Sequence, residues 1–266
     1  MPSVPDDGEV SARTVILDLL ATGHGAAFSA ADFVRAGTAF GLGPISMRTA
    51  ITRLKAETRL AQEGRGSYRV GPAAEPLQRR IRGWRSVLER RTCWDGAWLL
   101  ALAGPAERAD RTIWRHTVKA LGFEGFVEAE TNVWARPANL AGGAEAMRQR
   151  LAELGYASSL LLVTAWDFDA VRRERLPGLW DGPALAGGHT ELRIALQRSR
   201  DRLAQAEPAT AAAETLRLGR RAVRRIVLDP LLPDSFGTAE ALRALVAAME
   251  VYDGFGKAVW RDFLAA

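Results

Sequence analysis

The stretch PISMRTAITRLKAETRLAQEGRGSYRVG, residues 44–71, decides the fold of the amino-terminal part of this chain. Met47, Ile51 and Leu54 recur at i, i+4 and i+7, so they share one face of a helix and are expected to be buried. Two short extended runs follow this helix and flank Gly64-Arg65-Gly66, where glycine permits the positive φ of a tight turn. The pattern predicts a helix followed directly by a two-stranded hairpin.

The start and the outer face of the predicted helix carry polar and basic side chains. Ser46 is expected to cap the helix, with Ile45 before it as a hydrophobic staple. Arg65 lies at the hairpin tip, where an arginine suits a phosphate or the minor groove. Either half alone is typical of a solvated surface, but the two in succession favour DNA binding. The predicted DNA-binding residues are Ser46, Arg48, Thr49, Thr52, Arg53, Lys55, Arg65 and Ser67.

Two more helices are predicted ahead of this segment. A helix over residues 11–22 would place Val15 and Leu19 on one apolar face, and Ser29 is expected to cap the next helix. Three helices and a hairpin in this order predict a winged helix-turn-helix domain over residues 1–72.

The positive charge of the chain is concentrated at the same end. Residues 1–91 contain 14 Lys/Arg and 9 Asp/Glu, whereas residues 92–266 contain 22 of each, so the first segment holds the whole net charge of +5. Residues 44–91 alone contain 12 basic and 4 acidic residues. Such clustering attracts phosphate and is consistent with a nucleic-acid partner.

The composition excludes several classes of protein. No amino-terminal signal pattern and no apolar run of bilayer length occurs, so we expect a soluble, cytoplasmic protein without membrane contact. Cys93 is the single cysteine, and His24, His116 and His189 are scattered, so zinc-ligand spacing is absent from the sequence. We expect no metal and no cofactor.

Residues 73–91 are predicted to form a basic linker helix. Leu77, Ile81, Trp84 and Leu88 recur at helical spacing and would make one side of it apolar. The arginines of this segment suit either the DNA backbone or a solvated face.

Residues 92–174 are predicted to form a middle domain with the order β-α-β-β-α-β. Its first helix is expected to point Ile113, Val118 and Leu121 inward. The predicted elements are strand 98–103, helix 106–121, strands 123–130 and 132–136, helix 144–154 and strand 158–164. This order is typical of a ferredoxin-like sandwich.

Residues 175–266 are predicted to form an all-helical domain, for dimerisation or effector sensing. Thr190 is expected to cap one helix, Pro208 to open a long one and Thr238 to cap the last. The predicted fold class is therefore α+β, with a winged helix-turn-helix, a ferredoxin-like middle domain and a helical carboxy-terminal domain.

Short runs spaced along nearly the whole chain resemble one known family. They are MRTAITRLK (47–55), GRGSYRV (64–70), WDGAW (94–98), GF (122–123), Trp134 with Pro137, LWD (179–181) and DPLLP (229–233). In order and spacing they resemble the PaaX family of bacterial transcriptional repressors, named for control of phenylacetic acid degradation. Two runs depart from the family pattern: Glu57-Thr58-Arg59-Leu60 stands where Glu-Gly-aromatic-Leu is common, and Asp234-Ser235-Phe236-Gly237 where Trp-Pro-Gly is usual.

The resemblance implies a regulator without enzymatic activity. Its middle domain would be similar in fold to the small CRISPR-associated protein Cas2. Members of the family act as dimers on palindromic double-stranded DNA operators, and an acyl-CoA effector such as phenylacetyl-CoA releases them.

An effector site is predicted from the tryptophans and arginines of the last two domains. Buried indoles are first of all core material, and arginine clusters are more often solvated faces or salt bridges. The functional alternative is an apolar pocket with arginines that hold an anionic group. The predicted effector-binding residues are Trp98, Trp134, Arg172, Arg173 and Trp180.

Two other functions compete with the repressor. A Cas2-like domain could be a metal-dependent nuclease, but its first strand ends Leu102-Ala103-Gly104, and the nearest carboxylate, Asp95, precedes the strand, where a turn role is the commoner one. No phosphate-binding loop, HExxH or GxSxG motif is present. The third possibility is an adaptor whose helical domain recruits a protein partner.

Overall fold

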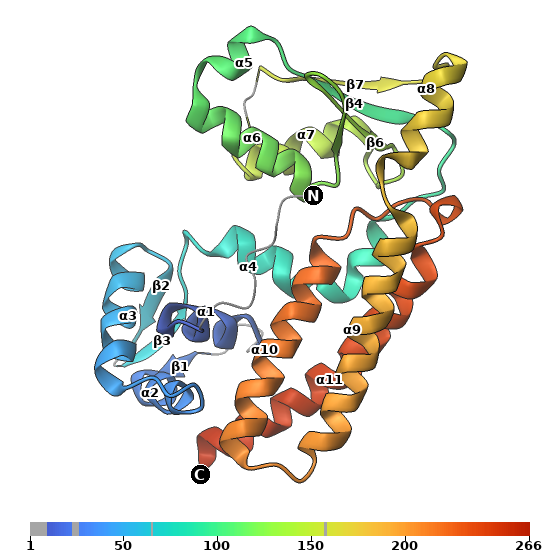
Figure 1. The fold of residues 1–266 in the computed structure, drawn as a ribbon. Coiled ribbons are helices and arrows are strands. Elements are labelled where there is room, and N and C mark those ends of the chain that lie inside the picture. Colours follow the sequence, from blue (N-terminus) through green and yellow to red (C-terminus); the bar gives the residue numbers. More distant parts are fainter. Residues whose placement is uncertain (1–9, 23–26, 65, 157–158) are drawn as a thin grey trace. The chain divides into compact units, whose positions relative to one another are not determined.

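The fold is that of a computed structural model, which describes residues 10–22, 27–64, 66–156 and 159–266. Helices predominate and two small antiparallel sheets accompany them, so the chain is of the mixed α+β type (Figure 1). It forms two compact units: unit 1 comprises Met1–Arg85, Glu191–Val227 and Leu245–Ala266, and unit 2 comprises Ser86–Thr190 and Leu228–Ala244. Each unit combines segments that are distant in sequence, and the division into four consecutive domains stays a prediction.

Unit 1 begins with three helices and a hairpin. In chain order the elements are α1 (Ala12–Thr22), β1 (Phe28–Ser29), α2 (Ala30–Thr38), α3 (Pro44–Ala56), β2 (Leu60–Glu63) and β3 (Ser67–Val70). The strands form an antiparallel sheet in the order β1-β3-β2. Ser29 caps α2 as predicted: its hydroxyl accepts the N–H of Asp32 at 3.0 Å, and the Asp32 carboxylate accepts the N–H of Ser29 at 2.7 Å.

The core of unit 1 joins these elements to two long helices near the end of the chain, α10 (Pro208–Val227) and α11 (Ala239–Ala265). Leu216 of α10 and Trp260 of α11 belong to the same apolar cluster as the helices of the amino-terminal part. The buried members from α1, α2 and α3 include Val15, Ile16, Leu19, Leu20, Phe33, Met47, Ile51 and Leu54. The inward faces predicted for α1 and α3 are therefore confirmed.

The start of α3 differs from the prediction. The helix begins at Pro44, and Gly43 is its cap residue, with an extended backbone (φ −73°, ψ 158°) and no side-chain cap bond. Proline is favoured in the first turn because its φ is preset and its missing N–H would have no helical partner there. Ser46 therefore lies inside the first turn, and Ile45 is 81% exposed, so the predicted serine cap and hydrophobic staple are wrong.

The single linker helix predicted over residues 73–91 is two shorter helices in the structure, and the first of them buries a different side from the one predicted. It consists of α4 (Glu75–Arg82) and a 3₁₀ helix, η1 (Gly83–Arg90), so the α-helical spacing ends at Gly83. Leu77 is 52% exposed, whereas Gln78 is buried and its amide donates to the carbonyl of Leu17 at 3.2 Å. The polar side chain faces α1 because it finds a backbone partner there. Trp84 is buried as expected.

Unit 2 contains the predicted β-α-β-β-α-β order. Its elements are β4 (Trp98–Leu102), α5 (Pro105–Ala109), α6 (Arg111–Phe123), β5 (Val127–Glu130), β6 (Val133–Pro137), α7 (Gly143–Glu153), β7 (Leu161–Ala165), α8 (Ala170–Arg175) and the 3₁₀ helix η2 (Leu176–Leu179). The antiparallel sheet has the strand order β5-β6-β4-β7, so the first and third strands of the motif lie at its centre.

The first helix of this motif is divided in two. Asp110 ends α5 and caps α6, because its carboxylate accepts the N–H groups of Thr112 at 2.7 Å and Ile113 at 3.0 Å. Leu121 is buried, but Ile113 and Val118 are 46% and 38% exposed. The inward prediction is thus wrong for these two residues. The buried side of α6 is formed by Thr117, Ala120 and Leu121.

A buried arginine fastens the DPLLP segment to the sheet of unit 2. The guanidinium of Arg136, at the end of β6, donates to the carbonyls of Glu124, Pro137 and Pro230. Asn139 donates to the carbonyl of Leu231 at 2.7 Å. These hydrogen bonds hold the carbonyls of Pro230 and Leu231 against the sheet. Burial lowers the pKa of the Arg136 guanidinium to about 9.

Three long helices follow unit 2's sheet in the chain. Helix α9 (Gly182–Leu203) begins nine residues earlier than expected, and Thr190 lies in its interior, where its hydroxyl donates to the carbonyl of Ala186 at 3.0 Å. Asp181 precedes α9 and accepts the N–H of Ala184, so the predicted Thr190 cap is wrong. Pro208 opens α10 as predicted, and the 3₁₀ helix η3 (Asp234–Phe236) precedes α11. Within the described residues, none of the helices has the length and apolarity needed to cross a bilayer.

Candidate nucleic-acid interface

Helix α3 has one buried and one exposed face, as the sequence predicts. Its buried side chains are Met47, Ala50, Ile51 and Leu54. The exposed ones are Pro44, Ile45, Ser46, Arg48, Thr49, Thr52, Arg53, Lys55 and Ala56. All six residues of α3 that the sequence proposed for DNA contact are therefore accessible to a ligand.

The exposed face has a middle and two flanks. At 3.6 residues per turn, Ile45, Thr49, Thr52 and Ala56 (i, i+4, i+7 and i+11) form a stripe opposite the buried side, which we call the outer stripe. Arg48 and Lys55 lie along one flank of the stripe, and Ser46 and Arg53 lie along the other. Ile45 was not among the predicted contact residues, although its spacing of four from Thr49 places it on the same face.

The carboxy-terminal end of α3 is closed by a Schellman motif. The N–H of Thr58 donates to the carbonyl of Lys55 at 2.9 Å, and the N–H of Arg59 donates to that of Leu54 at 2.9 Å. This motif needs a left-handed residue, and Thr58 has a φ of 53°. A β-branched residue is strained in that conformation, which glycine adopts at little cost.

The hairpin is joined to the last turn of α3. Lys55 Nζ donates to Gln62 Oε1 at 2.7 Å and lies 5.8 Å from the centre of the Tyr68 ring. Tyr68 in turn packs against Phe33 of α2, with ring centres 6.2 Å apart. The relative geometry of helix and hairpin is therefore fixed by polar and aromatic contacts.

The hairpin turn has the predicted backbone. Gly64 and Gly66 have φ angles of 64° and 82°. Arg65, the predicted tip contact, lies outside the described residues. Ser67 is half-buried and lies in register with Glu63 on one side and Ser29 on the other.

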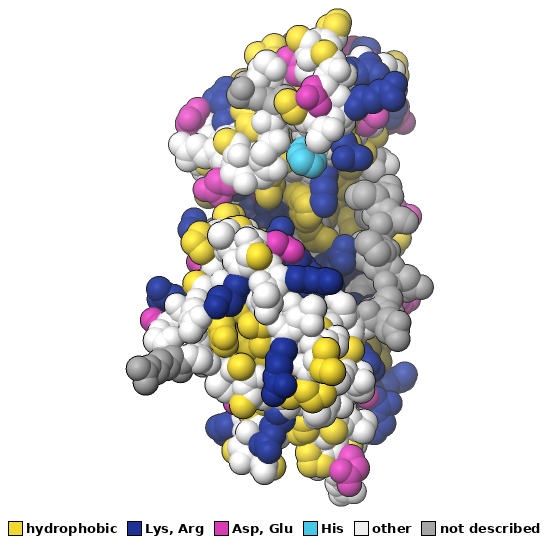
Figure 2. Space-filling view, turned by 90° about the vertical axis from the view of Figure 1, so that its left-hand side faces the viewer, with side chains coloured by type: hydrophobic (Ala, Val, Ile, Leu, Met, Phe, Trp, Pro, Cys, Tyr) yellow, Lys and Arg dark blue, Asp and Glu magenta, His cyan; other side chains and the backbone are white. Residues whose placement is uncertain are grey.

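Charge on this surface is mainly positive. Figure 2 views the side on which α3 lies and shows Lys and Arg side chains distributed over that surface. Glu57, at the end of α3, pairs with Arg13 at 2.6 Å, and the hydrogen bond from Arg13 lowers the pKa of Glu57. In the described part of the chain, no ion pair engages Arg48 or Arg53. Their guanidinium groups are available to an anionic ligand.

The predicted effector residues do not converge on one site. Trp98 and Trp180 are buried and stack with ring centres 6.0 Å apart, in a cluster that includes Trp94 and Phe236. Trp134 packs instead against Trp114 of α6, with ring centres 5.2 Å apart. The register of β4 with β6 pairs Trp134 with Ala101, three residues from Trp98, so alternation along the strand places Trp98 and Trp134 on opposite faces of the sheet.

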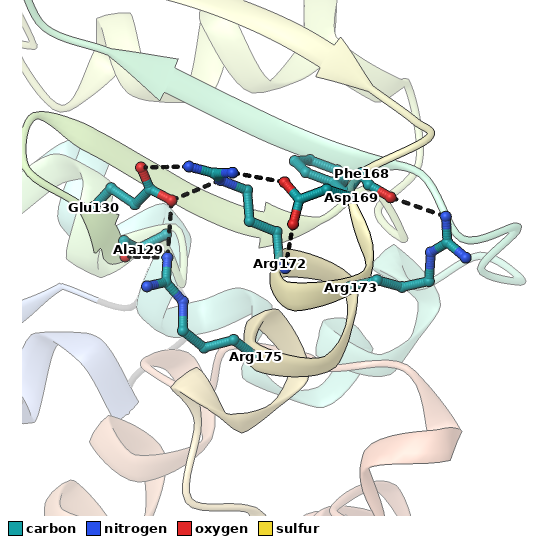
Figure 3. Close-up of polar contacts among 7 residues, drawn as sticks. All are labelled: Ala129, Glu130, Phe168, Asp169, Arg172, Arg173 and Arg175. Atoms are coloured by element: carbon teal, nitrogen blue, oxygen red, sulfur yellow. Dashed lines mark hydrogen bonds and ion pairs between the residues drawn. The ribbon is translucent and has the colours of Figure 1, made fainter.

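The arginines of α8 are held by acceptors of the protein itself, two of them by carboxylates and one by a backbone carbonyl (Figure 3). Arg172 binds Glu130 through two nitrogens, at 2.7 and 3.3 Å, and Asp169 at 2.6 Å. Arg175 binds the same Glu130 at 2.9 Å. Arg173 donates to the carbonyl of Phe168 at 2.8 Å. These contacts dock α8 on β5, and an anionic ligand of Arg172 would have to displace Glu130.

Asp95, the residue on which the nuclease alternative depends, has the turn role. Its Oδ1 accepts the N–H of Ala97 at 3.0 Å, and Trp94 Nε1 donates to the carbonyl of Ala97 at 2.6 Å. Over the described residues, His, Cys, Asp and Glu side chains form no group of three that could hold a metal ion. The absence of enzymatic activity stays a prediction.

No protein-family model matches this chain, and no curated protein matches it. Among solved structures it is similar to the uncharacterized protein Rv0674 from Mycobacterium tuberculosis, with a TM-score of 0.56 and 24% sequence identity. The likeness covers 93% of this chain and 99% of that chain. At this identity it shows a shared fold over nearly the whole length and nothing about function.

Proposed function

We propose that this protein is a sequence-specific, double-stranded DNA-binding transcriptional repressor of the PaaX type. The observation that carries the proposal is the exposed face of α3, whose flanks present Arg48, Arg53 and Lys55 while the opposite face is buried. In this proposal α1 to α3 with the hairpin β2–β3 form a winged helix-turn-helix, α3 lies in the major groove and the hairpin is the wing.

The contacts within the interface support this assignment. A reading helix must be held rigidly against the rest of the domain, and α3 buries Met47, Ile51 and Leu54 in the core of unit 1. The Lys55 to Gln62 hydrogen bond and the Schellman motif fix the direction in which the chain leaves the helix. Helix and wing would therefore meet DNA as one preformed surface, at a low cost in conformational entropy.

The test is DNA binding by an arginine variant with a matched control. Duplexes are selected from genomic fragments with the full chain, and their affinities are measured by fluorescence anisotropy. We expect Arg53→Ala to weaken binding to the selected duplex by about five- to 150-fold, which corresponds to about 1–3 kcal/mol for one base contact. Affinity of the parent protein should fall steeply with salt.

Arg200→Ala is the control, because Arg200 is an exposed arginine of α9 in unit 1 that pairs only with the neighbouring Asp201 among its described contacts. It should bind as the parent does. If folded Arg53→Ala bound the duplex as tightly as Arg200→Ala, the assignment of α3 as the reading helix would be wrong.

The remaining parts of the proposal concern regulation. In this proposal unit 2 contains a Cas2-like, ferredoxin-like domain, the protein acts in the cytoplasm as a homodimer on a palindromic operator, and an acyl-CoA such as phenylacetyl-CoA releases it. The strand order β5-β6-β4-β7 supports the ferredoxin-like part of the proposal. The effector is tested by adding a panel of acyl-CoA thioesters to the protein–duplex complex, and we expect one thioester to release the protein from the DNA. The dimer is tested by sedimentation of the protein, which we expect to have the mass of two chains.

A further inference from the structure

Ile45 is the most exposed of the large hydrophobic side chains in the described part of the chain, with 81% of its surface accessible. A single exposed apolar residue is ordinary on a protein surface. Its position is what matters here, because Ile45 is the second residue of α3 and begins the outer stripe. The first turns of a recognition helix are the part that contacts base edges.

The outer stripe as a whole presents methyl groups. Ile45 and Ala56 carry no polar side-chain atoms, and Thr49 and Thr52 each carry a methyl beside a hydroxyl. The hydroxyl of Thr52 donates to the carbonyl of Arg48 at 3.1 Å, so its hydrogen is used within the helix. The side chains that donate several hydrogen bonds stand on the flanks instead. The middle of this face is therefore suited to an apolar group.

In the major groove the only apolar group on a base edge is the C5 methyl of thymine. We infer that Ile45 is a specificity residue that packs on a thymine methyl of the operator. This inference rests on the proposed function, because it names the base that the same surface reads.

A protein partner is the less favourable occupant of this stripe. An apolar protein surface covering Ile45 would also remove water from Arg48 and Arg53, which have no ion pair in the described part of the chain, and burying unpaired charges is costly. DNA supplies phosphates beside the groove, so the methyl contact and the charge neutralisation occur together.

The test removes the methyl group from the DNA rather than from the protein. In a duplex selected by the parent chain, each thymine is replaced in turn by deoxyuridine, which lacks only the C5 methyl. For the parent we expect one thymine in each half-site at which this replacement weakens binding about three- to fivefold, the effect of one buried methyl group. The same replacement should leave Ile45→Ala unaffected, because the contact is already lost.

Val171→Ala is the matched control, because Val171 is a 72% exposed residue of α8 in unit 2. This variant should lose affinity at the same deoxyuridine positions as the parent. If the parent binds a selected duplex but no uracil position distinguishes it from Ile45→Ala, the inference is overturned and the proposed function stands. If no duplex can be selected at all, both are overturned. A selected site without thymine under α3 would also overturn the inference.

Discussion

Lys55 and Gln62 join α3 to the hairpin, with Lys55 Nζ 2.7 Å from Gln62 Oε1. The same ammonium group lies 5.8 Å from the Tyr68 ring centre on the other strand of the hairpin. One lysine thus contacts both strands while its charge stays on the exposed flank of α3. In the proposed function this arrangement would give Lys55 two separable roles, as a cation for phosphate and as a brace for the hairpin.

Variants of this pair should separate the two roles. Lys55→Ala removes one phosphate contact, so the slope of log K against log salt should become shallower by about 0.9. Gln62→Ala removes the brace but keeps the charge, so it should weaken binding slightly at every salt concentration without changing the slope. Anisotropy titrations from low to high salt measure both. Equal slopes for Lys55→Ala and the parent would show that Lys55 contacts no phosphate.

Thr58 is expected to limit the stability of unit 1. Its left-handed φ of 53° closes the Schellman motif, and the penalty for an L residue there is roughly 1–2 kcal/mol. Replacing Thr58 by Gly relieves that strain but also makes the unfolded chain more flexible, so we expect a net stabilisation of about 1 kcal/mol. Urea unfolding of the parent and the variant measures the difference.

Thr52→Gly provides the opposite control, because Thr52 lies inside α3, where glycine should cost up to about 1 kcal/mol. A gain from Thr58→Gly together with a loss from Thr52→Gly would assign the effect to backbone conformation. Destabilisation by both would mean that the Thr58 side chain contributes more than its strained backbone costs.

Asp18 should make unit 1 more stable at acid pH than at alkaline pH. Burial raises the pKa of its carboxyl to about 7, although Arg220 at 3.4 Å acts in the other direction. Because the folded-state pKa is raised above the unfolded value, the contribution to stability is present below about pH 4 and is lost as pH rises through 7. Asp18→Asn keeps the shape and cannot ionise.

The comparison is between the two proteins at pH 5 and pH 8. Asp18→Asn should gain stability relative to the parent on going from pH 5 to pH 8, by up to about 2 kcal/mol in the free energy of unfolding. Taking the difference between the two proteins cancels the other titrating groups. An unchanged difference across this range would show that Asp18 is ionised in the folded protein.

Local sequence patterns were sufficient to predict α3 and the hairpin that follows it. Periodicity identified the buried side of α3, and the glycines on both sides of Arg65 identified the turn, because these signals depend on few neighbours. The cap at Ser46 was mispredicted because two helix-start signals lie close together, Pro44 and Ser46. The helix begins at Pro44. Ile45 was assigned to packing for the same reason, and its exposure became visible only once the helix start was known.

Features that depend on distant segments were beyond the sequence. Gln78 is buried in place of Leu77 because a carbonyl of α1 accepts its amide hydrogen, and no local pattern records that partner. Trp98 and Trp134 were grouped as one effector site, yet strand alternation places them on opposite faces. The core that α3 shares with α10 and α11 likewise depends on distant chain segments, since Leu54 and Leu216 are 162 residues apart in sequence.

Arg136 gives a test of how the DPLLP segment is held within unit 2. Its guanidinium is buried and serves three carbonyls, of Glu124, Pro137 and Pro230, besides Asn139 Oδ1 at 3.2 Å. Arg136→Met keeps an apolar stem of similar length but leaves these acceptors without a donor. Each buried acceptor left unsatisfied costs about 1–3 kcal/mol, so we expect a loss of at least about 3 kcal/mol in the free energy of unfolding.

Arg173→Met is the matched comparison, because Arg173 is 70% exposed and its loss should change stability by less than about 0.5 kcal/mol. Amide hydrogen exchange separates a local from a general effect. If Arg136 fastens the segment, exchange at residues 228–233 should accelerate in Arg136→Met more than exchange in the strands β4 and β6. Uniform acceleration over unit 2 would contradict the fastening role and would mean that Arg136 supports the core as a whole.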